Sequence, residues 1–365
     1  MRPFRVAFTG DFLNEDGVSA YGDIGLSLLD AAAHVRYLFL TDQAPVKGDR
    51  SYYQRFCSQE LRAEHLADID GLVVLRPWLQ RCAFAHGARD LLVIGRSGAG
   101  YDKIDLAACT DNDVALFNAP LVLDHSTAST ALLFMLALAK RLPQQERLVR
   151  TERWDLQVVE RGHEIQGRTL GIVGLGRSGR ELARLVAPFA MRVLAYSPLA
   201  DPRQAEALGV QLTTLNEVCR EADFLSVHSR LTPEKHRLIG AAQLALMKPT
   251  AYFINVARGE LVDQDALFEA LRARRIAGAA LDVFTVEPLP ADDPLTKLDN
   301  VILTPHWNAS TADVWQATGK AMATGMLRAS QGLVPENVVN KDVLDRPGFR
   351  AKLARFAENR QDPAS

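Results

Sequence analysis

The sequence has few of the features that mark secreted, disulfide-bonded or membrane-spanning proteins. Four cysteines occur in 365 residues, far apart and without a C-x-x-C pair, so we expect reduced core thiols at Cys57, Cys82, Cys109 and Cys219. The longest apolar run, 131–139, has nine residues, whereas a bilayer span needs about 20, so it predicts a buried helix. The first apolar segment is short, and the acidic residues Asp11, Glu15 and Asp16 follow it, so we expect no export signal and a cytoplasmic protein.

A strong charge of either sign is also absent. The chain has 42 basic and 44 acidic residues, for a formal net charge of -2. No global field attracts such a protein to nucleic acid or to an anionic membrane, so local groups must bind any charged ligand. Hydrophobic residues make up 48% of the chain and charged ones 24%, which excludes a disordered scaffold. At about 150 residues per domain, the length predicts two domains.

Short β-branched segments alternate with helical ones along most of the chain. This alternation is typical of α/β proteins, in which helices cover both faces of a parallel sheet. The first block predicts strands at 5–9, 35–40, 71–75, 91–94 and 114–117. After a long helix over 126–141, the second block predicts strands at 169–173, 193–196, 224–227, 251–256, 278–281 and 301–303. A last helix is predicted over 310–330, and local sequence leaves open which domain it joins.

A glycine-rich turn opens the second block. The strand at 169–173 leads into Gly174-Leu175-Gly176-Arg177-Ser178-Gly179, and a helical segment follows. In this G-x-G-x-x-G pattern the first glycine permits a tight turn, the second lets the backbone approach a pyrophosphate, and the third lets helix pack on strand. The N–H groups at the start of the helix then face the phosphates. The segment predicts a dinucleotide site.

The acidic residue that usually accompanies this turn is missing. In NAD-binding units a carboxylate about 20 residues further on binds the adenosine ribose hydroxyls. Here the next strand ends at Ser197, and Asp201 and Arg203 follow. Asp201 could replace the missing acid, or Ser197 with Arg203 could accept the 2′-phosphate of NADP. We slightly favour NAD and leave the choice open.

Three polar residues follow three later strands of the second block: Arg258, Glu287 and His306. Ligands of open α/β sheets bind at the carboxyl ends of the strands, so these side chains can converge beside the dinucleotide. An arginine offers a fork of donors to the carboxylate and carbonyl of a 2-oxo acid. A histidine can protonate the alkoxide that hydride transfer creates, and a carboxylate on its other ring nitrogen would orient it. The set predicts reduction of a 2-oxo acid.

The chain resembles the D-isomer-specific 2-hydroxyacid dehydrogenase family, to which phosphoglycerate dehydrogenases, glyoxylate/hydroxypyruvate reductases and D-lactate dehydrogenases belong. The likeness covers most of the chain and rests on the segments 95–105, 117–120, 171–179, 228–234, 246–249 and 306–311, together with those around Arg258 and Glu287. It implies that Arg258 binds substrate and that Glu287 pairs with His306, the proton donor. It also implies further roles: in cofactor binding for Gly174, Gly176, Arg177, Ser178, Gly179, Ser197, His228, Val256, Ala257 and Asp282, and in binding the substrate carboxylate for Gly98, Ala99 and Gly100. No metal is implied.

The resemblance also implies the architecture. A Rossmann cofactor domain, 118–306, is expected as an insertion in a flavodoxin-like substrate domain made of 1–117 and 307–345, with catalysis in the cleft between them. The charged stretch 346–365 is expected as a tail, either a solvated terminal helix or a basic partner-binding segment. Family members are usually dimers joined through the helix after Asp124, so a homodimer is expected.

Departures from the family pattern concern the substrate. Trp307 stands where a smaller residue is common, and with Arg76 and Trp78 it forms a candidate pocket for a polar or acidic substrate tail. An exposed Arg76 is an equal alternative. The run 128–131 also differs from the family's usual Ala-Glu-His-Thr. Two other functions stay open: a dinucleotide-sensing protein resembling corepressors on this fold, and a formate or phosphite dehydrogenase, although formate enzymes have glutamine at the position of Glu287.

Overall fold

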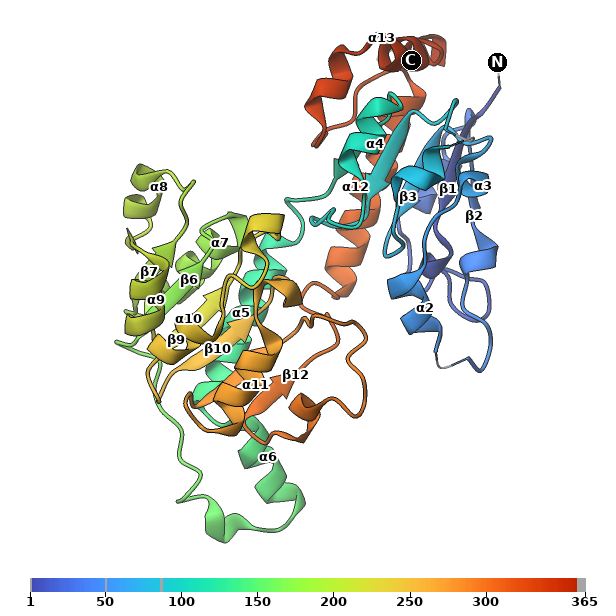
Figure 1. The fold of residues 1–365 in the computed structure, drawn as a ribbon. Helices are drawn as coiled ribbons and strands as arrows, with labels where there is room; N and C mark the ends of the chain where they lie inside the picture. Colours follow the sequence, from blue (N-terminus) through green and yellow to red (C-terminus); the bar gives the residue numbers. More distant parts are fainter. Residues whose placement is uncertain (1, 50, 86–87, 360–365) are drawn as a thin grey trace. The chain divides into compact units, whose positions relative to one another are not determined.

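The computed structural model describes residues 2–49, 51–85 and 88–359 (Figure 1). The chain divides into two compact units. Unit 1 consists of Met1–Leu123 and Ser310–Ser365, and unit 2 is Asp124–Ala309. The predicted α/β class is confirmed, because each unit is built on one parallel sheet with helices packed against it.

Unit 1 has a five-stranded parallel sheet in the order β2-β1-β3-β4-β5. Its strands are β1 (Phe4–Phe8), β2 (Val35–Phe39), β3 (Gly71–Val74), β4 (Val93–Arg96) and β5 (Ala115–Asn118). Its helices are α1 (Leu26–Asp30), α2 (Tyr52–Ser58), α3 (Ala63–Leu66), α4 (Leu106–Asp111), α12 (Ala312–Ser330) and α13 (Pro347–Ala354). This is the strand order of flavodoxin-like folds, in which the order of the strands reverses between β1 and β3.

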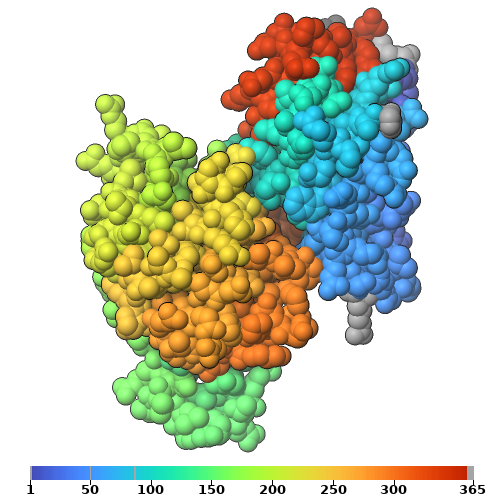
Figure 2. Space-filling model, viewed as in Figure 1, coloured from blue at the N-terminus to red at the C-terminus, as the bar shows by residue number. Residues whose placement is uncertain are grey.

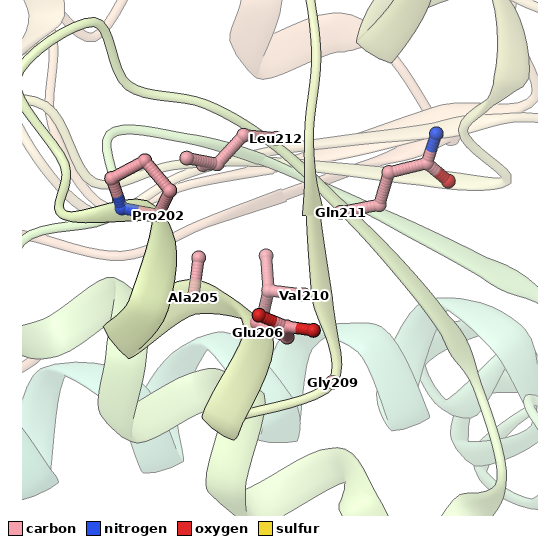
Figure 3. A pocket seen from close by; sticks show the side chains of 7 residues that line it. All are labelled: Pro202, Ala205, Glu206, Gly209, Val210, Gln211 and Leu212. Atoms are coloured by element: carbon pink, nitrogen blue, oxygen red, sulfur yellow. The ribbon is translucent and has the colours of Figure 1, made fainter.

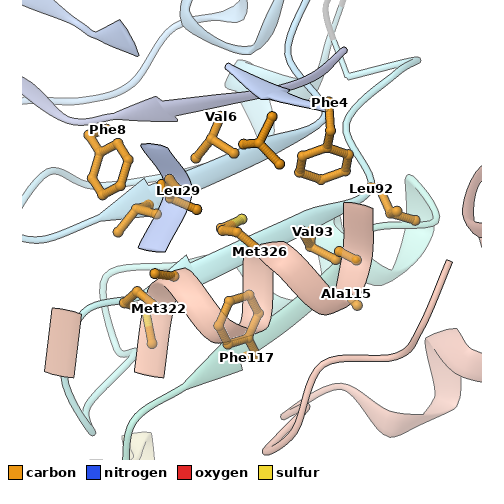
Figure 4. Close-up of a cluster of buried hydrophobic side chains, with 14 of the residues drawn as sticks. Phe4, Val6, Phe8, Leu29, Leu92, Val93, Ala115, Phe117, Met322 and Met326 are labelled. Atoms are coloured by element: carbon orange, nitrogen blue, oxygen red, sulfur yellow. The ribbon is translucent and has the colours of Figure 1, made fainter. Parts of the chain in front are cut away.

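Helix α12 packs closely against the sheet of unit 1 (Figure 4). Its Met322 and Met326 are buried among Phe4, Phe8 and other aromatic and aliphatic side chains. A Cβ atom on Gly71 would lie 2.6 Å from the Met326 sulfur, so only glycine lets the helix approach this strand so closely. The segment that follows Ser310 is therefore part of the core of unit 1.

The charged C-terminal segment is not the solvated or partner-binding tail that its composition suggested. Phe349 and Phe356 are buried in the core of unit 1. The Lys352 ammonium donates hydrogen bonds to the carbonyls of Leu91 at 2.9 Å and Asn112 at 2.7 Å. Two aromatic residues among many charged ones thus dock the segment as far as residue 359, and the expected tail residues 360–365 lie outside the described residues.

Unit 2 has a seven-stranded parallel sheet in the order β12-β11-β10-β9-β6-β7-β8. Its strands are β6 (Thr169–Val173), β7 (Arg192–Tyr196), β8 (Val210–Leu212), β9 (Phe224–Val227), β10 (Tyr252–Asn255), β11 (Gly278–Leu281) and β12 (Val301–Leu303). This is a Rossmann order extended by one strand, with its reversal between β6 and β9. The sequence pattern missed β8 because this edge strand has three residues, one of them the polar Gln211.

The helices of unit 2 are α5 (Asp124–Ala139), α6 (Leu142–Arg150), α7 (Arg177–Val186), α8 (Pro202–Ala207), α9 (Leu215–Glu221), α10 (Ala241–Leu246) and α11 (Gln264–Arg272). Helix α5 holds the long apolar run, and most of that run is buried as predicted. None of the helices in the described ranges has the length and hydrophobicity needed to cross a membrane.

The four cysteines differ in their environments. Cys109 and Cys219 are buried, and burial raises the pKa of each thiol to about 12. Cys82 is exposed, so the prediction of a core thiol was wrong there. The reason is that the short turn over Arg81–Phe84 buries Ala83 and Phe84 and turns Cys82 outward. No disulfide is present among the described residues.

Candidate active site

The glycine-rich turn lies at the carboxyl end of β6, where the strand order of unit 2 reverses. Gly174 has a φ of +101°, and a Cβ there would lie 2.6 Å from the Ser229 Cα atom. A Cβ on Gly179 would clash with the Gly174 carbonyl, so this glycine lets α7 pack on the turn. Nothing lies within 4 Å of the Cβ position of Gly176. The turn therefore presents open backbone at the start of a ten-residue helix, as a pyrophosphate requires.

Arg177 and Ser178 in the first turn of α7 are both held by neighbouring side chains. The Arg177 Nε atom lies 2.6 Å from an Asp124 carboxylate oxygen at the start of α5. The Ser178 hydroxyl lies 3.1 Å from His228 Nδ1, and the Ser226 hydroxyl lies 3.0 Å from Nε2 of the same ring. Burial lowers the pKa of His228 to about 4, so its ring is neutral at pH 7. His228 therefore orients Ser178 and contributes no positive charge.

Glu287 and His306 form a hydrogen-bonded pair. The Nδ1 atom of His306 lies 2.8 Å from a Glu287 carboxylate oxygen. Burial tends to raise the pKa of Glu287, but the hydrogen bond and charge of His306, the Phe284 N–H and the charge of Arg258 outweigh it and lower the pKa below the ordinary value. Glu287 is thus ionised at neutral pH, and His306 presents its Nε2 side to other groups. This is the arrangement that the sequence predicted for an acid–base pair.

His306 adopts an unusual backbone conformation, with a φ of +50°. Residues other than glycine seldom adopt this left-handed conformation, and it persists where surrounding groups hold it in place. The His306 N–H donates to the Asp282 carbonyl at 2.8 Å. Hydrogen bonds from the backbone N–H groups of Trp307 and Asn308 to the Asp282 carboxylate fix the rest of the turn.

The Asp282 carboxylate is fully buried and anchors the turn that carries His306. One oxygen accepts hydrogen bonds from the Trp307 N–H at 2.8 Å and the Thr304 hydroxyl at 2.5 Å. The other accepts from the Asn308 N–H at 2.9 Å. A carboxylate has about four acceptor sites, so this geometry is compatible with a further contact to a nicotinamide carboxamide. The positioning of His306 is a role for Asp282 that sequence reasoning missed.

Asn308 is a second residue that the sequence analysis missed. It is buried, and its side-chain amide donates to the Val256 carbonyl at 3.1 Å. Its backbone carbonyl accepts hydrogen bonds from the hydroxyls of Ser126 at 2.9 Å and Thr130 at 3.0 Å on α5. The unusual 128–131 run therefore helps to hold the turn after His306. In the sequence, the available signal was an asparagine two residues after a histidine that follows a predicted strand.

Arg258 follows β10, next to Val256 and Ala257. Its carbonyl accepts a hydrogen bond from the Asn255 side chain at 2.9 Å, and its guanidinium donates to the Ala257 carbonyl at 2.8 Å. A Cβ on Gly259 would overlap the Phe284 backbone, so this glycine lets the two strand-end loops meet. The positive charge of Arg258 is one of the groups that lower the pKa of Glu287.

The predicted carboxylate-binding loop belongs to unit 1, after β4. Gly98 has a φ of +144°, and a Cβ there would clash with the Arg96 guanidinium. The Asn118 side chain donates to the Ala99 carbonyl at 2.7 Å, and the Ala119 N–H donates to the Gly98 carbonyl at 3.1 Å. With carbonyls of the loop bound to β5 and the residue after it, the N–H groups of Gly98 to Gly100 can form an anion-binding turn.

Arg76 lies at the strand-order reversal of unit 1 and is largely buried. Its guanidinium is 3.4 Å from the buried Asp11 carboxylate, and its backbone N–H donates to the same carboxylate at 3.0 Å. The guanidinium carbon lies 5.0 Å from the Tyr53 ring centroid and 5.9 Å from that of Tyr21. The Trp78 indole donates to the Cys57 carbonyl at 3.0 Å. Arg76 and Trp78 thus belong to unit 1, whereas Trp307, which is 40% exposed, belongs to unit 2.

The surface groove in Figure 3 lies apart from these residues. It has a volume of about 310 Å³, lies between α8 and β8, and contains none of the candidate site residues. No group of three or more histidine, cysteine or acidic side chains that could hold a metal ion occurs in the described ranges.

A phosphate-binding turn and a His–Glu pair with a nearby arginine, carried on one Rossmann sheet, define a nicotinamide-dinucleotide-dependent oxidoreductase. Comparison with known proteins agrees. Residues 132–308 match the family model described as D-isomer specific 2-hydroxyacid dehydrogenase, NAD binding domain. The chain is 35% identical over 328 residues to glyoxylate reductase of Korarchaeum cryptofilum, covering 86% of this chain and 99% of that protein. The chain belongs to the D-isomer-specific 2-hydroxyacid dehydrogenase family.

Other relatives show the range of the family. D-3-phosphoglycerate dehydrogenase of Methanocaldococcus jannaschii is 40% identical over 284 residues, which are 78% of this chain and 54% of that protein. The chain thus spans about half the length of that relative. The holo D-mandelate dehydrogenase of Rhodotorula graminis superposes with a TM-score of 0.77 at 27% identity, covering 93% of this chain and 98% of that one.

Proposed function

We propose that the protein interconverts a 2-oxo acid and an (R)-2-hydroxy acid, with Arg258, Glu287 and His306 as its catalytic residues. The hydrogen bond of 2.8 Å between His306 and the ionised Glu287 carries the proposal. It leaves one ring nitrogen of His306 available for a proton transfer, on the sheet that bears the phosphate-binding turn.

The cofactor, when bound, supplies or accepts the hydride. The backbone around Gly174, Gly176 and Gly179 binds its pyrophosphate together with Arg177 and Ser178. Ser197, His228, Val256, Ala257 and Asp282 complete the cofactor site.

In the reduction, Arg258 binds the carboxylate and carbonyl of the substrate and favours charge on the carbonyl oxygen. His306 donates its proton to that oxygen as the alkoxide forms, and Glu287 stabilises the charged ring and holds its orientation. The N–H groups of Gly98, Ala99 and Gly100 bind the substrate carboxylate. In the oxidation, His306 accepts the proton back.

For the substrate we propose a short 2-oxo acid with a polar, uncharged tail. Arg76 is paired with the buried Asp11, so their formal charges cancel and the pair offers little attraction to a phosphate. Arg76 still offers donors beside the Tyr21 and Tyr53 rings of unit 1. Relatives named glyoxylate reductase act, by that name, on the smallest 2-oxo acid, which has no tail and is short as proposed here.

Stopped-flow oxidation of NADH and NADPH tests the proposal, with glyoxylate, hydroxypyruvate, pyruvate, phenylglyoxylate and 3-phosphohydroxypyruvate as substrates. We expect His306→Asn and Arg258→Ala to lower turnover at least about 100-fold. The exposed His236 of the same unit provides the control His236→Asn, which should keep full activity. Turnover of phosphite or formate alone, or tight dinucleotide binding without turnover of any acid, would show that another function is correct.

We also propose that the protein is a homodimer. Exposed apolar side chains gather on α5, on α6 and in the segment after it: Leu133, Leu142, Val149, Trp154, Val158 and Val159. The segment after α6 forms a lobe standing off the body of unit 2, coloured green in Figure 2. Clusters of exposed apolar residues commonly mark protein interfaces. Light scattering should give twice the monomer mass, and Trp154→Asp with Val159→Asp should give the monomer.

We further propose that the protein works in the cytoplasm. Two of its cysteines are buried and no disulfide is present among the described residues, which suits a reducing compartment. Fractionation of cells that produce the tagged protein checks this, since recovery in an exported fraction would contradict it.

A further inference from the structure

The end of β7 lies directly beside the phosphate-binding turn. Val173 and Tyr196 are paired in the sheet, and the Gly174 N–H donates to the Tyr196 carbonyl at 2.9 Å. Ser197 is therefore the first residue beyond the strand at the point where NAD-binding units place a carboxylate for the adenosine ribose. A serine hydroxyl there neither attracts the 2′-hydroxyl as a carboxylate does nor repels a 2′-phosphate.

Asp201, the next carboxylate along the chain, is already used by the fold. The Ala200 N–H donates to the Ser197 carbonyl at 3.0 Å, which closes a tight turn. Asp201 follows as the N-cap of α8, and its carboxylate accepts the Arg203 N–H at 3.0 Å. One carboxylate oxygen of Asp201 is thus held at the N-cap of α8, which makes Asp201 less free than an uncommitted carboxylate to bind the ribose hydroxyls.

Two basic residues, Arg203 and Lys235, follow the two strands that neighbour β6 in the sheet. The exposed Arg203 side chain makes no hydrogen bond or ion pair with another described residue. On the other side of β6, the Lys235 ammonium donates to the Ser229 hydroxyl at 3.0 Å, and Ser229 lies against Gly174. Glu234, the acidic neighbour of Lys235, is exposed. Lys235 thus lies beside the phosphate-binding turn, and Arg203 lies in the first turn of α8, which begins five residues after Ser197.

We propose that the ribose site of this protein accepts a 2′-phosphate, with Arg203 as its main cation, so that NADP(H) binds more tightly than NAD(H). The inference rests on the proposed cofactor site and reverses the slight preference for NAD drawn from sequence. It names Ser197 and Arg203 as the residues that determine cofactor preference, because one omits the repelling charge and the other supplies an attracting one.

Binding of adenosine fragments tests the inference without any turnover. Isothermal titration calorimetry with 2′,5′-ADP and 5′-AMP compares two ligands that differ only in the 2′-phosphate. We expect the wild type to bind 2′,5′-ADP about tenfold more tightly, a ratio that Arg203→Ala reduces several-fold. Ser197→Asp should reduce the ratio at least about tenfold, because it places a negative charge beside the phosphate. Arg220→Ala removes a charge near the end of α9, close to the amino ends of the strands and therefore away from the turn at their carboxyl ends, and should leave the ratio unchanged.

The outcomes separate this inference from the proposed reaction. Tighter binding of 5′-AMP by the wild type, or a ratio unaffected by Arg203→Ala, would overturn the inference even if a 2-oxo acid is reduced. The expected ratios would support it even if no 2-oxo acid is turned over. Failure of both nucleotides to bind would refute the cofactor site itself and the inference with it.

Discussion

Replacement of Asp282 by asparagine should test how the turn that carries His306 is held. The carboxylate accepts two backbone N–H groups and one hydroxyl, and the two N–H groups lie on different oxygens. The side-chain amide of asparagine has only one acceptor. In either orientation its NH₂ group therefore faces the N–H of Trp307 or of Asn308.

The magnitude follows from these contacts. A hydrogen bond to a charged group contributes about 1.5–3 kcal/mol, and a buried donor left without a partner costs about 1–3 kcal/mol. Because Asp282 is 0% exposed, water cannot replace the lost acceptor. We expect Asp282→Asn to destabilise the turn by about 2–4 kcal/mol. His306, at a φ of +50°, should then lose its position, and a shift of about 1 Å at a catalytic group can lower kcat/KM about 100-fold.

Hydrogen exchange of residues 301–309 and kcat/KM for the best 2-oxo acid measure the two effects. Asp299→Asn provides a matched control, because Asp299 is an exposed acid of the same unit that pairs only at the surface with Arg274. If Asp282→Asn exchanges as slowly as the wild type and keeps its kcat/KM within twofold, the anchoring role of Asp282 is refuted.

Three further predictions concern the glycine turn, the C-terminal segment and pH. Gly176→Ala should leave the unfolding midpoint unchanged but weaken dinucleotide binding at least about tenfold, because its Cβ enters the open space where the phosphate would bind. Gly179→Ala should destabilise the fold, because its Cβ clashes with the Gly174 carbonyl. Calorimetry measures the binding and urea unfolding the stability, and equal stabilities of the two variants would contradict the different roles of these glycines. Phe349→Ala should destabilise unit 1 by about 3–5 kcal/mol in urea unfolding, while exposed Arg350→Ala should change little, and a solvated tail would show no difference. The pKa of Glu287 in the folded protein lies below its unfolded value of about 4.3, so its charge stabilises the fold above that pH, and this stabilisation is lost as the pH falls through the folded pKa. The difference in unfolding free energy between wild type and Glu287→Gln should therefore shrink below about pH 4. A difference that does not change with pH would count against the ion pair with His306.

Much of the fold and site could be predicted because the signals are local. The alternation of β-branched and helical segments located eleven of the strands, and missed only the three-residue β8. The glycine spacing, set between a predicted strand and a predicted helix, revealed the turn from Gly174 to Gly179. Arg258, Glu287 and His306 were found because each follows a strand of one parallel sheet, whose carboxyl ends share an edge.

The features that the sequence did not predict depend on contacts between residues that lie far apart along the chain. Composition suggested a solvated charged tail, but Phe349 and Phe356 find their contacts in a core built by distant strands. Nothing in the segment around Asp282 indicates that it anchors the residues after His306, because its partners lie more than 20 positions away.

The sequence by itself therefore determined the class of fold, the dinucleotide turn and the Glu287–His306 pair that we propose for proton transfer, since each depends on short-range spacing. Only the tertiary structure decided which charges remain available. It assigned Asp201 to a helix cap, and it paired Arg76 with Asp11, 65 residues away, because a buried charge must find a partner wherever the fold provides one. Those assignments govern the cofactor and the substrate that we expect the protein to prefer.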